Sequence, residues 1–94
     1  MAVKKSITSN PRLTVSRYGD GTVHVKIDGY EVVRTRDRKT VRVADIYLYE
    51  DGYESGMVAS YDEDGRCIRY APLDHDKVQK AVRELDLWQY ASVA

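Results

Sequence analysis

Residues 41–72, VRVADIYLYEDGYESGMVASYDEDGRCIRYAP, are the stretch that most constrains how this chain can fold. Apolar and polar residues alternate within it, and two acidic segments that contain Gly52 and Gly65 interrupt the alternation. Alternation with a period of two is typical of a half-buried strand, and glycine supplies the positive φ angles of tight turns. The stretch therefore predicts three antiparallel strands joined by two turns, with tyrosine in every strand.

Further strands are expected before this stretch. Apolar residues alternate on both sides of Gly19-Asp20-Gly21, which predicts a hairpin over residues 12–27. Asp28-Gly29 follows directly, and this pair favours a two-residue type I′ turn into a third strand. The charged link over residues 37–40 is either a four-residue turn or the continuation of a long bent ribbon.

The fourth expected strand contains a conflict of phase, because its two valines would lie on one face and Ile46 and Leu48 on the other. A β-bulge near residues 44–45 would bring all four apolar side chains inward and turn Tyr47 and Tyr49 outward. A regular register would instead bury the two tyrosines and leave the other apolar pair for a second layer, such as a helix.

The C-terminal segment is the one convincing helix, expected from about Asp74 to Tyr90. Asp74 can cap its N-terminus, and apolar residues recur at the spacing of a stripe that faces a sheet. This stripe consists of Val78, Ala81, Val82, Leu85 and Trp88. Leu87 would lie about 180° from Val78 on the outer face, with Tyr90 beside it, which makes the two a candidate partner-binding pair.

Together these elements predict an α+β fold. An antiparallel sheet of about five to six strands, connected as hairpins or a meander, would carry one C-terminal helix on one face. A chain of 94 residues has room for one two-layer core. We expect residues 12–94 to form a single domain, and the polar residues 1–11 to form a flexible N-terminal arm. The sequence leaves open whether the sheet is flat or curls into a barrel.

The composition narrows the possible locations and partners. The net charge is +0, and no stretch approaches the roughly 20 apolar residues of a membrane span. No membrane partner is therefore expected. Cys67 is the single cysteine and cannot form an internal disulfide, so a reducing cytoplasmic location is expected. Residues 1–42 hold ten basic and four acidic side chains, and residues 43–94 hold five and eleven. The basic and acidic halves either pair with each other inside the fold, or present a basic face and an acidic face to different partners.

No catalytic or cofactor motif accompanies this pattern. The candidates for a nucleophile and a base are Cys67, His24 and His75, and their sequence context does not predict a triad. Asp74-His75-Asp76 lacks the ligand spacing of a zinc site, and the sequence contains no phosphate-binding glycine loop. We therefore expect a protein that is not an enzyme and uses no cofactor and no metal.

The tyrosine content indicates protein binding. The chain has Tyr 8, Trp 1 and Phe 0, so its aromatic bulk is almost wholly amphipathic, as in protein interfaces. Tyrosine can also be plain strand-filling bulk. We expect a module that binds another protein, of the kind with which phages and mobile elements inhibit a host protein, and a homodimer stays open. The expected contact residues are Tyr47, Tyr49, Tyr53 on a glycine-flanked loop, Leu87 and Tyr90.

A basic segment supports an alternative, a nucleic-acid-binding domain. The segment over residues 34–42 carries Arg34, Arg36, Arg38, Lys39 and Arg42. A two-stranded ribbon with arginines fits the major groove, and guanidinium groups bind phosphates or guanine edges bidentately. The order of three strands and a helix is also similar to small DNA-binding domains such as integrase arm-binding domains, without a shared motif. The neutral net charge makes nucleic acid the less expected partner.

Overall fold

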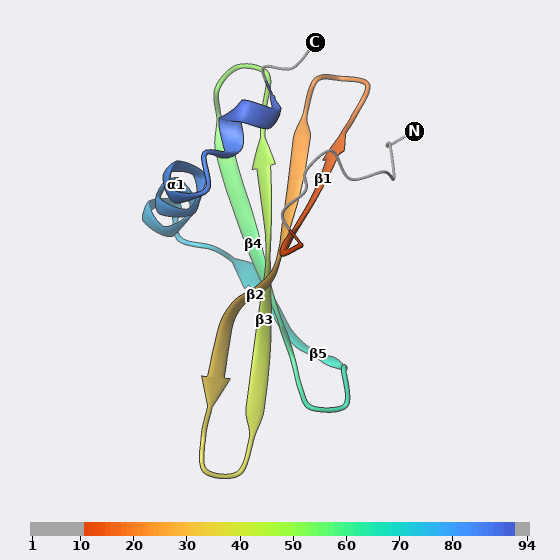
Figure 1. Ribbon diagram of the computed structural model, residues 1–94, viewed down its shortest axis with the longest axis vertical. Helices are drawn as coiled ribbons and strands as arrows, with labels where there is room; N and C mark the ends of the chain where they lie inside the picture. The colour runs from red at the N-terminus through yellow and green to blue at the C-terminus, as the bar shows by residue number, and fades with distance from the viewer. Residues whose placement is uncertain (1–10, 92–94) are drawn as a thin grey trace.

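The computed structural model describes residues 11–91 as an antiparallel meander, in which each strand pairs with its neighbours in sequence (Figure 1). The elements in chain order are β1 (Leu13–Arg17), β2 (Val23–Arg34), β3 (Lys39–Leu48), β4 (Glu54–Tyr61), β5 (Cys67–Pro72), α1 (His75–Glu84) and the 3-10 helix η1 (Leu87–Tyr90). This arrangement confirms the expected α+β fold, with five strands and one C-terminal helix. The flexible arm expected over residues 1–11 lies outside the described residues, apart from Pro11.

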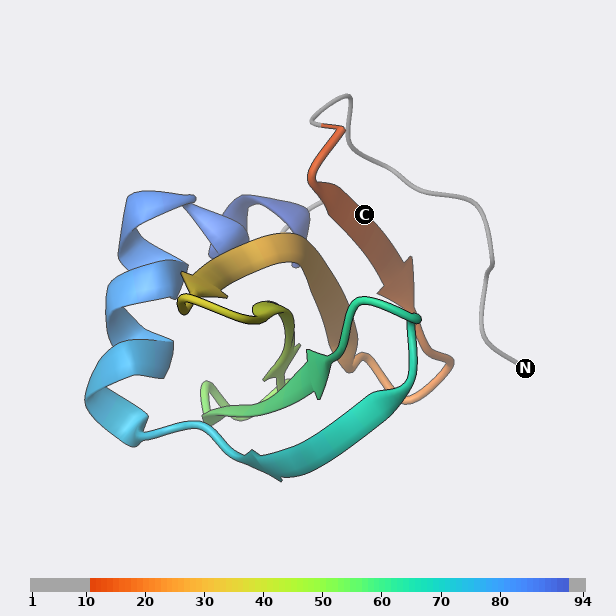
Figure 2. The same cartoon turned by 90° about the horizontal axis from the view of Figure 1, so that it is seen from below.

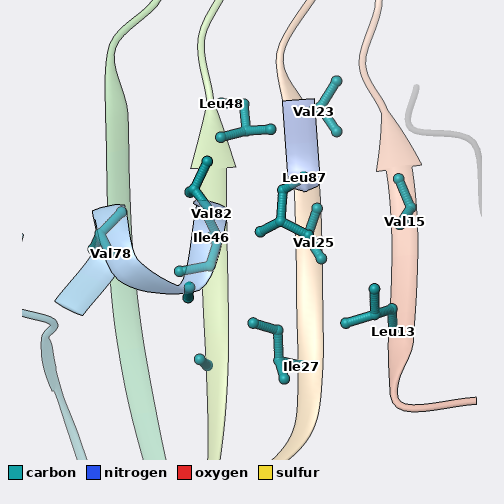
Figure 3. Close-up of a cluster of buried hydrophobic side chains, with 12 residues drawn as sticks. Leu13, Val15, Val23, Val25, Ile27, Ile46, Leu48, Val78, Val82 and Leu87 are labelled. Carbon is teal, nitrogen blue, oxygen red and sulfur yellow. The ribbon is translucent and has the colours of Figure 1, made fainter. Parts of the chain in front are cut away.

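Alternate residues of β1, β2 and β3 form the sheet's contribution to the core. Because successive side chains of a strand point to opposite faces, these residues share one face, which we call the helix face. It consists of Leu13, Val15, Val23, Val25, Ile27, Ala44, Ile46 and Leu48. Val78 and Val82 of α1 and Leu87 of η1 pack onto this face (Figure 3). The core therefore lies at the end of the molecule where α1 covers the sheet (Figure 1).

Gly56 of β4 sets how closely α1 approaches the sheet. A Cβ atom at this position would lie 2.9 Å from Val78 Cγ2 and 3.0 Å from Ile46 Cδ1. Both distances are well below the optimal carbon–carbon separation of about 3.5–4.0 Å. The helix can therefore rest on β4 only because residue 56 has no side chain.

The helix ends earlier than its sequence pattern predicts. α1 stops at Glu84, and Asp86 adopts a left-handed conformation with φ 48° before η1 begins. This reversal points Leu87 into the core, where it is 0% exposed. The expectation that Leu87 lies on an outer helix face is wrong, because the periodicity of 100° per residue does not continue past the break. Tyr90 is also partly buried against the core.

The first half of the sheet departs from the expected turns. β2 runs through Asp28-Gly29 without a hairpin turn, and residues 28–30 lie opposite Val43 alone. The pair therefore forms a bulge, in which Gly29 keeps a positive φ of 64°. The turn predicted at this pair is wrong, because an αL glycine serves a bulge as well as a turn.

β3 pairs with β4 in regular register from Val41 to Leu48. The bulge expected near residues 44–45 is therefore wrong. The register is regular and Ile46 and Leu48 face the helix, as in the alternative, but Tyr47 and Tyr49 are only partly buried rather than buried. β2 and β3 form a long ribbon that extends beyond α1 (Figure 1). Its turn lies at residues 35–38, where the Thr35 N–H donates to the Arg38 carbonyl oxygen at 2.8 Å.

Candidate functional site

The sheet has a second face, opposite α1, that no helix covers in the described part of the chain (Figure 2). The strand register assigns residues to it: His24 pairs with Tyr47, and Ala59 pairs with both Val43 and Tyr70. We call it the open face. It includes His24, Lys26, Val41, Val43, Asp45, Tyr47, Ser55, Met57, Ala59, Tyr61 and Tyr70.

Six of the eight tyrosines lie on the open face or at its rim. Tyr47, Tyr61 and Tyr70 are on the face itself, and Tyr18, Tyr49 and Tyr53 come from the adjoining turns at one end. The rings of Tyr49 and Tyr53 lie with their centroids 5.7 Å apart. The two remaining tyrosines, Tyr30 and Tyr90, pack against the core from the helix side. The tyrosines are therefore strongly biased to one side of the molecule.

His24 and Asp45 hold the ring of Tyr47. The rings of His24 and Tyr47 stack with centroids 4.8 Å apart and an interplanar angle of 23°. His24 Nε2 lies 2.8 Å from Asp45 Oδ1, and the two side chains are only 18% and 19% exposed. A ring that is already immobilised loses less conformational entropy when a partner covers it. These contacts therefore restrict the orientation of the Tyr47 ring in the free protein.

The phenol groups of the open face lie close enough to affect one another's ionisation. Burial raises the pKa of Tyr47, and the charge of Asp45 and the phenols of Tyr70, Tyr18 and Tyr49 raise it further. Burial also raises the pKa of Tyr70, followed by Asp45, Tyr61 and Cys67. A raised pKa means that the folded protein favours the neutral phenol, which can donate a hydrogen bond.

We expect Tyr47→Phe to remove one late-ionising phenol from an absorbance titration at alkaline pH. The pKa of Tyr47 is higher in the folded state than its unfolded value, so its stabilising contribution is complete below about pH 10 and is lost as the pH rises through the folded pKa. Above about pH 10, the melting temperature of the variant should therefore fall less steeply with pH than that of the wild type. Tyr53→Phe is the matched control, since Tyr53 is 59% exposed. An identical titration of both variants would contradict this assignment.

The five contact residues expected from sequence do not form one surface. Tyr47, Tyr49 and Tyr53 lie together at the end of β3, whereas Leu87 and Tyr90 belong to the helix side. Sequence reasoning missed Tyr61 and Tyr70. Period-two alternation through β4 would have placed Tyr61 on the open face once β3 was taken in regular register. Tyr70 could not be placed this way, because the register of β4 and β5 shifts between Ser60 and Tyr61.

The five basic residues of segment 34–42 are also divided. Arg34, Arg36, Arg38 and Lys39 are exposed at the far end of the β2–β3 ribbon, whereas the side chain of Arg42 forms an ion pair with Glu31. The backbone N–H of Lys39 donates to Glu63 Oε1 at 3.0 Å, and the hollow beside Lys39 is lined by Asp62, Glu63 and Asp64 as well. The basic end of the ribbon is thus flanked by the acidic turn between β4 and β5.

Ser16, His24 and Asp45, a set of residue types also found in catalytic triads, lie on the same side of the sheet as the open face. Ser16 of β1 lies opposite His24 in the register, and His24 is bonded to Asp45. A nucleophilic triad needs a hydroxyl–imidazole hydrogen bond. Within residues 11–91 no such bond joins Ser16 to His24; the contacts of the His24 ring are those with Asp45 and Tyr47. The same residues contain no group of three or more potential metal ligands, and none of their helices is long and apolar enough to span a membrane.

Comparison of the chain with known protein families, curated proteins and solved structures finds no match. Its function must therefore be inferred from the chemistry of its own surfaces.

Proposed function

We propose that the protein is a non-enzymatic module that binds another protein through the open face. The observation that carries this proposal is the gathering of six tyrosines on and around the one sheet face that α1 does not cover. Tyrosine offers a large, rigid contact area and a hydroxyl group for hydrogen bonding, and it is enriched at the energetic centres of protein interfaces.

The open face has the layered composition of an interface core. Val43 and Ala59 are 9% and 4% exposed and form an apolar floor. Tyr47, Met57 and Tyr61 are partly buried around them. A fitting partner would present apolar side chains to these partly exposed residues above the floor, and carbonyl or carboxylate oxygens to their phenol hydroxyls.

The charge distribution at the end of the ribbon does not favour nucleic acid as a partner. The four exposed basic residues at the end of the ribbon are balanced by Asp37 and the acidic turn over residues 62–64. Phosphate binding depends on uncompensated positive charge, and its strength falls steeply with salt. Binding to DNA should therefore be weak and salt-labile. The inhibition of a host protein expected from the sequence stays a prediction, to be tested once the partner is known.

The first experiment locates the contact surface. A photo-crosslinking amino acid is placed either at Tyr61, on the open face, or at Lys80 on α1, whose side chain is 74% exposed. We expect one discrete protein adduct from position 61 and none from position 80. Adducts that form preferentially from position 80 would overturn the proposal.

The second experiment measures the affinity for the protein so identified. Tyr47→Ala should weaken binding about 30-fold or more, which corresponds to about 2 kcal/mol, as truncation of a central interface tyrosine does. Arg36→Ala, at the far end of the ribbon, is the matched control and should bind normally. Full affinity of Tyr47→Ala together with a lowered melting temperature would show that this ring is structural only.

A further inference from the structure

β5 is an edge strand whose side chains are largely exposed. It ends the strand order, and residues 67–70 and Pro72 are all exposed. Two large apolar side chains, Ile68 and Tyr70, are 57% and 56% exposed. An open edge carries unpaired backbone N–H and C=O groups, which form a template for another strand.

The hydrogen-bond phase between β4 and β5 identifies which of these groups point away from the sheet. Met57 pairs with Pro72 and Ala59 with Tyr70, and the Leu73 N–H donates to the Gly56 carbonyl oxygen at 2.9 Å. The Gly56–Leu73 pair is therefore hydrogen-bonded. Since such pairs alternate along an antiparallel ladder, the Ala59–Tyr70 pair is not. Tyr70 thus directs both its N–H and its C=O outward.

Pro72 independently supports this alternation of hydrogen-bonded and non-hydrogen-bonded pairs between β4 and β5. It lies two residues from Tyr70, also at a position without a ladder bond to β4. Proline has no N–H to donate, so it is tolerated in an edge strand only at such a position. The free edge is therefore centred on Tyr70 and ends at Pro72.

We propose that two copies of this chain pair antiparallel through β5, about a two-fold axis at Tyr70. In this register the Tyr70 N–H of each copy donates to the Tyr70 carbonyl oxygen of the other. The two exposed tyrosine rings then meet at the axis, on the open-face side, and cover each other.

The charges of β5 favour this register. With Tyr70 on the axis, Arg69 of one copy lies opposite Ala71 of the other. Arg66 directly precedes β5 and Asp74 follows its end, so antiparallel pairing brings these two exposed side chains of opposite charge to the same end of the contact. A register centred on Arg69 would place two guanidinium groups directly opposite each other, which is destabilising.

Pairing of this kind joins the two twisted sheets edge to edge (Figure 2). Because the two-fold axis is perpendicular to β5 at Tyr70, the open-face sides of the two β5 strands lie on the same side of the junction. The contact itself is confined to one short strand from each copy, so it belongs to the small, weak class of interfaces. The pairing does not depend on what the open face binds.

A disulfide tests the register directly. In a Cys67→Ser background, Tyr70→Cys places two cysteines opposite each other, about 5.5 Å apart between Cα atoms, within the range of about 4.4–6.8 Å that a disulfide spans. Arg69→Cys is the matched control, since its residue lies opposite position 71 of the other copy. We expect efficient covalent dimerisation on mild oxidation of the first variant only. Equal or greater cross-linking of the control would overturn the proposal.

Sedimentation equilibrium tests the pairing without a cross-link. The wild-type mass should rise with concentration from 10.8 kDa towards twice that value. Tyr70→Pro deletes the outward N–H and leaves the β4–β5 bonds in place, so it should stay monomeric with an unchanged circular dichroism spectrum, whereas Tyr70→Phe should still dimerise. A wild-type protein that is monomeric at every concentration, or a Tyr70→Pro variant that still dimerises, would refute the proposal.

Discussion

Leu87→Ala is expected to lower the free energy of unfolding by about 2–5 kcal/mol, the range found for fully buried leucines. Leu87 is 0% exposed and belongs to the core cluster that includes Val25 and Val82 (Figure 3). Truncation removes its buried apolar surface and leaves a cavity that the rigid sheet beneath cannot close. The measurement is the urea-induced unfolding midpoint and slope.

Leu85→Ala is the matched control for this prediction. Leu85 is only partly buried against the same cluster, so its truncation should cost clearly less. A continuous helix to Tyr90 would reverse this order, since it would put Leu85 in the apolar stripe and Leu87 on the outer face. A larger loss for Leu85→Ala would therefore contradict the break at Asp86.

The strands could be predicted because their signals are local. Alternation in β1 and the first part of β2 marks both the strands and the faces they bury. β5 was found from its bounding turn and Pro72 and is largely exposed. Asp28-Gly29 misled because its chemistry specifies only a positive φ, which Gly29 adopts in either a turn or a bulge. The pairing of β2 with β3 on both sides of the bulge decided between them.

The end of the helix could not be predicted from its sequence. Asp86 is the only non-glycine residue with a positive φ among those described, and neither glycine nor proline marks the position. The apolar pattern also continues past it in Leu87 and Trp88. The free energy gained by burying Leu87 offsets the conformational strain of the left-handed Asp86. This gain depends on tertiary packing, which the local sequence does not show.

The candidate surface was predictable only where its residues stand out in the local sequence. Tyr47 and Tyr49 stand out in one strand, and Tyr53 stands out in its loop. Tyr61 and Tyr70 join them only through the register of three strands, in which Val41 pairs with Tyr61 and Ala59 with Tyr70. This register requires β3 to be free of bulges. The sequence alone did not decide between a regular and a bulged β3.

Gly56→Val is expected to lower the free energy of unfolding by about 1–3 kcal/mol, as overpacking of a close-packed core does. Even its Cβ atom would lie 2.9 Å from Val78 Cγ2, so α1 must move away from β4. The intrinsic preference of valine for strands opposes this loss but spans at most about 1 kcal/mol. Gly56→Ala should fall between the wild type and Gly56→Val. A valine variant as stable as the wild type would mean that α1 does not rest on this residue.

The same variant separates the two faces of the sheet functionally. Gly56 lies on the helix face, opposite Ile46 in the register, whereas Tyr47, Tyr61 and Tyr70 lie on the open face. Binding measured at a temperature where the variant is folded should therefore match the wild type, although the variant melts earlier. Loss of affinity in a folded Gly56→Val protein would place the contact surface on the helix side. Preserved affinity would leave α1 the role of a support that holds the sheet in shape while its opposite face makes contact.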